Sequence, residues 1–209
     1  MPFYDDCRQS KTISTGPSTA LELILLCHAA TRAMKTGRFP TGDEPAERHA
    51  PAAPAPAHAE DAARVIASPA RVARETAACI ARSFDIDPAF DDIDYGRWRG
   101  RSIREIGECE PANIAAWLDD PRVCPHGGES VAMLAARVIE GIARIEGEAR
   151  SGRCIVVTHA IVVKAAVAHA LGKPLSSIGA MNFAPLSRTV LKRQSGAEAW
   201  TVELPCPPA

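Results

Sequence analysis

The chain has 209 residues, a formal net charge of −1 and 46% hydrophobic residues. This length fits one domain with a substantial core, and the near-zero charge gives no electrostatic basis for nucleic-acid binding. Residues 1–18 contain no apolar stretch, so neither a secretory signal nor a membrane-spanning segment is expected there. The seven cysteines form no C-x-x-C pair, which argues against a disulfide framework or a structural zinc site and favours a reduced, cytoplasmic protein.

The first 27 residues divide into a polar part and an apolar part. Residues 1–20 are polar and aperiodic, and we expect a disordered extension there. Residues 21–27 are an apolar run that predicts a buried strand, and the run ends at His28. Ligands of open α/β sheets bind at the carboxyl ends of strands, so His28 is a candidate for chemistry. A lone histidine in this context is nevertheless more often a hydrogen-bonded structural residue.

The segment at residues 31–63 is predicted to be a long loop punctuated by glycine and proline. Its basic residues Arg32, Lys35 and Arg38 either hold an anion or form a solvated surface. The prolines between Pro45 and Pro56 exclude one uninterrupted helix, because an interior proline removes a donor and clashes with the preceding turn.

The rest of the chain alternates between strand and helix patterns, which predicts an α/β fold. Helix starts are marked by Ser68-Pro69, by the Ser102–Glu105 capping box and by Pro111. The expected elements are strands at 64–67, 153–158, 181–183, 189–192 and 200–204, and helices at 68–83, from 102, from 111, at 131–150 and at 161–171. The strand at 153–158 ends in His159 and Ala160, which repeats the arrangement around His28 and favours a functional pair of histidines.

Four segments together resemble the histidine phosphatase superfamily, which has the phosphoglycerate-mutase-like fold. They are LCHAAT, SPARVARETA, DYGRWRG with PHGGES, and VVTHAIVVKAAVAHALG. The resemblance covers residues 21–204, which we expect to form one domain, with 205–209 as a tail. It implies a three-layer sandwich with a mainly parallel central sheet.

The resemblance also implies roles for individual residues. His28 falls on the family's nucleophile, which becomes phosphorylated, and His159 on its second histidine. The proton donor falls on Asp92, where the family often has Glu, and Asp94 is a rival for this role. The two arginines that hold phosphoryl oxygens in the family fall on Cys27 and Val72.

Other cations are therefore needed if this chain binds phosphate. Lys35, Arg38, Arg71 and Arg97 are candidates, of which Arg38 and Arg71 are the preferred substrate-binding residues. Ala160 joins them, because a small residue after the second histidine lets a substrate approach closely. No metal and no cofactor are implied, and the expected partner is a small anionic substrate; the oligomeric state stays open.

Three functions are consistent with these residues. The first is a phosphomonoester hydrolase that acts through a phosphohistidine with a degenerate phosphate pocket. The second is an acid–base enzyme such as a lyase, isomerase or cyclase, whose histidines titrate nearer neutral pH because two neighbouring positive charges are lost. The third is a pseudo-enzyme that only binds a ligand; metal capture by Cys27, His28 and His159 is disfavoured, because adjacent residues of a strand point to opposite faces.

Overall fold

A central six-stranded sheet in the order β3-β2-β4-β1-β5-β6 organises the protein. The computed structural model describes residues 20–47, 64–148, 152–194, 197 and 199–205. The expected extension at 1–20, apart from Ala20, lies outside the described residues, as do Pro51–Pro56 and most of the tail. The strands are β1 (Ala20–Cys27), β2 (Arg64–Ala67), β3 (Asp85–Ile86), β4 (Gly152–Thr158), β5 (Arg188–Gln194) and β6 (Thr201–Glu203).

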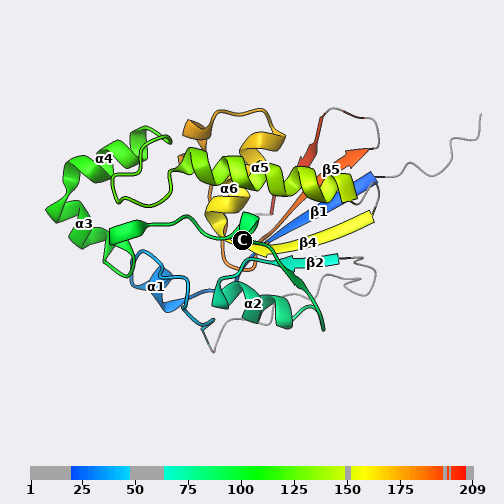
Figure 1. Ribbon diagram of the computed structural model, residues 1–209, viewed down its shortest axis with the longest axis horizontal. Coiled ribbons are helices and arrows are strands. Elements are labelled where there is room, and N and C mark those ends of the chain that lie inside the picture. Colours follow the sequence, from blue (N-terminus) through cyan, green and yellow to red (C-terminus); the bar gives the residue numbers. More distant parts are fainter. Residues whose placement is uncertain (1–19, 48–63, 149–151, 195–196, 198, 206–209) are drawn as a thin grey trace, which may run out of the picture.

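Four strands are parallel to one another, and β5 pairs antiparallel with both β1 and β6, so the predicted mainly parallel sheet is confirmed. The α-helices are α1 (Arg32–Lys35), α2 (Arg71–Ala78), α3 (Ile103–Cys109), α4 (Pro111–Asp119), α5 (Val131–Glu148) and α6 (Ala160–Ala170). Short 3-10 turns are η2 (Pro88–Phe90), η3 (Gly96–Trp98) and η4 (Leu175–Ala180). Helices α5 and α6 cover one face of the sheet and α2 the other, which gives three layers (Figure 1).

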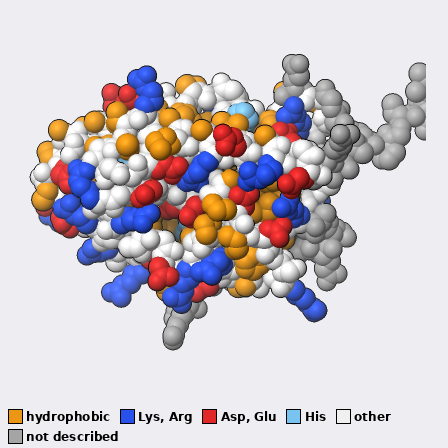
Figure 2. Space-filling model, viewed as in Figure 1, with side chains coloured by type: hydrophobic (Ala, Val, Ile, Leu, Met, Phe, Trp, Pro, Cys, Tyr) orange, Lys and Arg blue, Asp and Glu red, His pale blue; other side chains and the backbone are white. Residues whose placement is uncertain are grey.

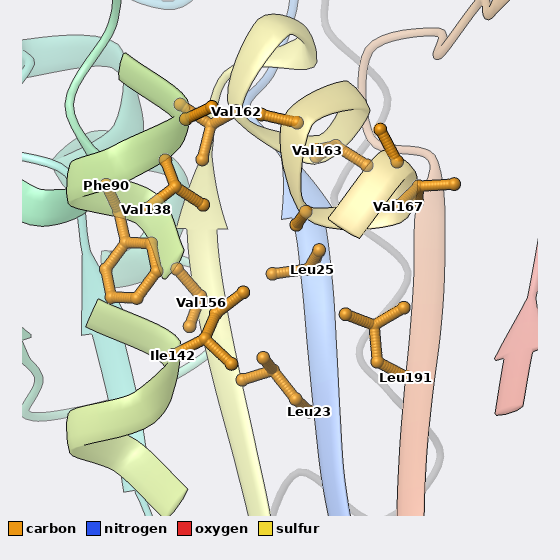
Figure 3. Close-up of a cluster of buried hydrophobic side chains, with 14 of the residues drawn as sticks. Leu23, Leu25, Phe90, Val138, Ile142, Val156, Val162, Val163, Val167 and Leu191 are labelled. Carbon is orange, nitrogen blue, oxygen red and sulfur yellow. The ribbon is translucent and has the colours of Figure 1, made fainter. Parts of the chain in front are cut away.

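Side-chain alternation along β1 explains why the sheet is covered on both faces. Leu23 and Leu25 pack with α5 and α6, as Figure 3 shows, whereas Ile24 and Leu26 pack with α2 on the other side. A strand that is buried on both faces reads as a continuous apolar run rather than as an alternating one. This is why the 21–27 run was recognisable as a central strand.

Three predictions differ from the structure. The segment predicted to be a loop after β1 contains the short helix α1. Residues 181–183 form no strand, because β5 already occupies the free edge of β1 and Pro185 cannot donate to a ladder. The helix expected at 68–83 is the shorter α2, and its N-cap is Ala70 rather than Ser68. The hydroxyl of Ser68 is used elsewhere, as described below.

Helices α1, α3 and α4 lie beyond the carboxyl ends of the parallel strands, at the left of Figure 1. Ser102 caps α3 as predicted, and its hydroxyl accepts the Glu105 N–H. On the face seen in Figure 2, Lys and Arg side chains alternate with Asp and Glu side chains, and no patch of one sign dominates. Among the described residues, no helix is long and apolar enough to cross a membrane.

Candidate active site

A cavity of about 300 Å³ opens at the carboxyl edge of the sheet. Parallel strands end at the same edge, so the residues that follow β1 and β4 meet there. The cavity is bounded by residues at the ends of these strands, by α1 and the loop after it, by the start of α2, and by α4 and α6. Its walls contain His28, His159, Asp92, Arg38 and Ala160, five of the six residues predicted for the site.

His28 stands one residue beyond β1, in the wall of the cavity. Its backbone N–H donates to the carbonyl of Thr158 at 2.8 Å, which ties it to the end of β4. Its ring Nδ1 lies 2.7 Å from the carbonyl oxygen of Ala29, an acceptor only, so Nδ1 carries the proton and Nε2 has the free lone pair. Burial, and secondarily the nearby His159, lower the pKa of His28 from 6.5 to about 4. The ring is therefore neutral at physiological pH.

His159 is the N-cap of α6 and is only 4% exposed. Its ring meets that of His28 edge to face, with centroids 4.8 Å apart, so the two predicted histidines do face each other. Burial lowers its pKa to about 4 as well. The expectation that both histidines titrate nearer neutral pH is therefore wrong, because desolvation lowers the pKa of both rings.

The candidate proton donors occupy different places. Asp92 lines the cavity, and its Oδ2 lies 3.5 Å from Nδ1 of His159. Burial raises the pKa of Asp92 from 3.8 to about 6, which brings it within reach of neutral pH. Asp94 instead accepts the Gly96 N–H at 2.7 Å and pairs with Arg99, and it is not part of the cavity wall. The geometry thus favours Asp92 over its rival.

Cys27 and Val72 both line the cavity, at 3% and 5% exposure. The positions assigned to the two family arginines therefore face the site, and both lack a charge. Burial raises the pKa of the Cys27 thiol to about 11, so no thiolate replaces the missing charges. Among the described residues, no group of three His, Cys, Asp or Glu side chains is arranged to hold a metal ion.

The structure does not bring every candidate cation to the cavity. Arg71 is exposed on α2, where it pairs with Glu75 at 2.8 Å, and it is absent from the cavity wall. Lys35 pairs with Glu47, and Arg97 with Glu110. Arg38 does line the cavity, and its guanidinium donates to the Gly100 carbonyl at 2.9 Å rather than to a carboxylate.

Lys164 is a cavity cation that the sequence analysis missed. It follows Ala160 by four residues, so both lie on the face of α6 that borders the cavity. Burial lowers its pKa, and within the described part of the chain no carboxylate forms an ion pair with it. The four-residue spacing from Ala160 was the signal that would have found it.

Aromatic side chains form another part of the cavity wall. Tyr95 and Trp117 line the cavity, and behind them Phe39 and Trp98 complete a cluster with ring centroids 4.9 to 6.2 Å apart. These rings offer apolar surface within the cavity.

Comparison with known proteins agrees with this geometry. Residues 23–204 match the family model of the histidine phosphatase superfamily (branch 1). The chain is 34% identical to a bifunctional protein of Mycobacterium tuberculosis over 106 residues, which are 49% of this chain and 29% of that protein. It is 30% identical to the glucosyl-3-phosphoglycerate phosphatase of Mycolicibacterium vanbaalenii over 124 residues, 54% of this chain and 55% of the relative. The match thus spans 29% of the length of the first relative and 55% of the length of the second.

A solved structure shows the same fold. The mycobacterial glucosyl-3-phosphoglycerate phosphatase in complex with VO3 superposes with a TM-score of 0.76 at 23% identity, covering 88% of this chain and 97% of that one. With the match over residues 23–204, the chain belongs to the histidine phosphatase superfamily, branch 1.

Proposed function

We propose that this protein is a phosphomonoester hydrolase that acts on a small phosphorylated molecule through a phosphohistidine on His28. One observation carries the proposal: a neutral histidine with a free Nε2 faces a second histidine and a protonatable carboxylate, Asp92, in one cavity. The relatives named glucosyl-3-phosphoglycerate phosphatase and phosphoserine phosphatase, the latter from Hydrogenobacter thermophilus, support this reaction type. Their substrates are small phosphate esters.

The reaction has two displacements at phosphorus. First, Nε2 of His28 forms a bond to phosphorus while the ester P–O bond breaks, and Asp92 gives its proton to the leaving oxygen. Then water attacks the phosphohistidine, Asp92 takes a proton from this water, and the N–P bond breaks. Inorganic phosphate leaves, His28 is neutral again and Asp92 is protonated again.

In this protein the negative charge of the phosphate is bound by groups that the chain retains. Phosphoryl transfer depends chiefly on positioning and on electrostatic stabilisation. Lys164 and Arg38 are the cations of the cavity wall. The backbone N–H groups of Ala160 and Ile161 begin α6 and have no intrahelical acceptor, so they can donate to an anion. An ammonium makes no bidentate contact, so we expect a lower rate than two guanidiniums would give.

The assignment of Lys164 has a matched control. Lys164→Ala should raise KM for a phosphate ester and lower kcat by about 10²-fold, the effect of losing one preorganised donor. Lys35→Ala removes a lysine that pairs with Glu47 outside the cavity, and it should leave both constants unchanged. Equal effects of the two variants would refute the role of Lys164.

A substrate screen tests the activity itself. Purified protein is offered a panel of phosphate monoesters, and released phosphate is measured, with His28→Ala as the control. Acid-labile phosphate bound to the wild type in quenched reactions, and absent from His28→Ala, would confirm the intermediate. Hydrolysis that survives in His28→Ala, or a panel with no substrate, would sink the proposal and return attention to acid–base or binding functions.

A cytoplasmic setting is part of the proposal. The five described cysteines are all free thiols, as expected of a reducing compartment. A small anionic substrate is the expected partner, because the cavity holds cations and has the volume of a small-molecule site.

A further inference from the structure

A hydrogen-bonded chain leads from His159 to Asp91, a carboxylate to which neither the family match nor the proposed mechanism gives a role. Nε2 of His159 lies 2.8 Å from Oγ of Ser68, and this oxygen lies 2.9 Å from Oδ1 of Asp91. Ser68 is fully buried, whereas the side chain of Asp91 is 42% exposed and lines a second cavity of about 220 Å³.

The chemistry of the three groups fixes the direction of these bonds. A carboxylate only accepts, so the Ser68 hydroxyl donates to Asp91. The Ser68 oxygen then accepts, both from the Ala70 N–H at 3.1 Å and from His159. His159 therefore carries its proton on Nε2, and Nδ1 keeps a lone pair.

This lone pair is buried and has no hydrogen-bond partner in the described structure. It faces Oδ2 of Asp92 at 3.5 Å, and an ionised carboxylate there would place two acceptors against each other. A proton on Asp92 removes this conflict, because the acid then donates towards Nδ1.

We propose that Ser68 and Asp91 are positioning residues that hold His159 in its Nε2–H form, so that Nδ1 favours the protonated state of Asp92. The tautomer itself follows from the geometry alone, whereas its effect on rate rests on the proposed phosphatase function. The alternative tautomer, with the proton on Nδ1, would donate to the Asp92 carboxylate and stabilise it without its proton.

Other charged groups surround the pair, and all are held in place. His28 lies near both residues at the end of β1. Glu44, in the loop after α1, lies near His28 and His159. From α5, Arg137 pairs with Glu129 and donates to the backbone carbonyls of Asp91 and Asp92. None of these groups forms a hydrogen bond with the ring of His159, so Ser68 is its one hydrogen-bond partner within the described part of the chain.

Two substitutions at Asp91 separate geometry from charge. In Asp91→Ala the Ser68 hydroxyl loses its acceptor, turns to donate to Nε2, and the proton of His159 should move to Nδ1. In Asp91→Asn the amide oxygen still accepts from Ser68, because the Asp92 N–H, 2.9 Å from Oδ1 in the wild type, keeps an oxygen there. The tautomer should then stay as in the wild type.

The tautomer is read from ring ¹⁵N chemical shifts of the full chain, with His159→Asn to assign the signals. This measurement needs no activity, so its outcome stands whether or not the phosphatase proposal holds. A wild-type ring protonated on Nδ1, or the same tautomer in Asp91→Ala as in the wild type, would overturn the inference. These variants change only a half-exposed side chain, and buried Ser68 itself is kept in both.

Kinetics on an alkyl phosphate, whose leaving oxygen needs a proton, give the second readout. Asp91→Ala should lower kcat by about 10- to 100-fold with little change in KM. This loss is no larger than the smallest contribution typical of a general acid, about 10²-fold, because Asp92 itself is retained. Asp91→Asn should keep kcat but shift the alkaline limb of the pH profile to lower pH, because a neighbouring negative charge that raises the pKa of Asp92 is gone. Asp43→Asn, an exposed carboxylate in the wall of the same second cavity, is the control and should change neither. An Asp91→Ala effect no larger than that of Asp43→Asn would contradict the positioning role.

Discussion

His28 and His159 face each other because β1 and β4 are neighbouring parallel strands in a fixed register. Cys27 pairs with Thr158, so each histidine stands one residue beyond the last pair of the ladder. Their rings approach edge to face with 4.8 Å between centroids. Two imidazolium ions at this distance would repel each other in a buried site, so protonating either ring disfavours protonating the other.

This pair predicts acid sensitivity of the fold. The pKa of each histidine falls from 6.5 in the unfolded chain to about 4 in the fold, so between these values the unfolded state binds more protons. Stability should therefore be fully present above pH 6.5 and decrease as the pH falls towards 4. Urea unfolding at several pH values measures this slope, which should be smaller in His159→Asn than in the wild type. An equal slope in that variant would show that other groups cause the acid sensitivity.

The raised pKa of Asp92 predicts a dependence on the leaving group. A nitrophenolate leaves without a proton, whereas an alkoxide needs one from Asp92. Asp92→Asn should therefore lower the rate of His28 phosphorylation, measured in a single turnover, by about 10²-fold or more for an alkyl phosphate and much less for p-nitrophenyl phosphate. In the wild type, alkyl phosphate hydrolysis should decline as the pH rises through about 6, where Asp92 loses its proton. The same variant at Asp94 is the control, and a larger loss there would reassign the donor.

Local rules of strand ends were sufficient to predict His28 and His159 in one site, whereas Asp92 was predicted only from the resemblance to the histidine phosphatase superfamily. A polar residue that ends a buried parallel strand has only one edge of the sheet to occupy. The loss of charge at Val72 was also predictable, because its neighbour Arg71 lies about 100° away around the helix. The structure has Val72 buried in the cavity wall and Arg71 exposed.

Features that depend on contacts between distant parts of the chain were not predictable from the sequence. Ser68 has the sequence context of an N-cap, but His159 and Asp91 bind its hydroxyl, and both come from distant parts of the chain. Residues 181–183 have an apolar pattern, but β5 had already taken the edge of the sheet. Lys164 lies in a helix that is apolar almost all round, and only the cavity beside it gives its charge a role.

Two glycines allow the loop of Tyr95 to pack closely against the loop that precedes α5. A Cβ on Gly96, whose φ is +47°, would overlap the backbone of residues 126–128, and one on Gly128 would overlap the backbone of Asp94. Gly96→Ala and Gly128→Ala should each lower the free energy of unfolding by more than the 1–3 kcal/mol of ordinary backbone strain, since backbone must move. Gly107→Ala, in open space on α3, should instead raise it by up to about 1 kcal/mol. Denaturant unfolding of the three variants checks this order, and similar effects at all three positions would show that the loops are not tightly joined.

Restoring the two arginines tests how far the pocket still fits phosphate. Cys27→Arg and Val72→Arg both place a guanidinium in the cavity wall, where it can donate two charge-assisted bonds to phosphoryl oxygens. Hydrolysis of a generic phosphate ester should rise in each, and more in the double variant, because both act on the same developing charge.

These gains should come with a loss of stability. Both positions are buried, and Cys27 lies near the ammonium of Lys164, so an added cation without its anion is costly. The free energy of unfolding should fall without ligand and recover with vanadate, by about 2.7 kcal/mol at a hundred times the dissociation constant. Adding Lys164→Ala to Cys27→Arg should relieve the repulsion, which would show that lysine and arginine compete for one anion site. A double variant that folds and binds vanadate but hydrolyses nothing would mean that the chain has lost more than its cations, and the phosphatase proposal would fail.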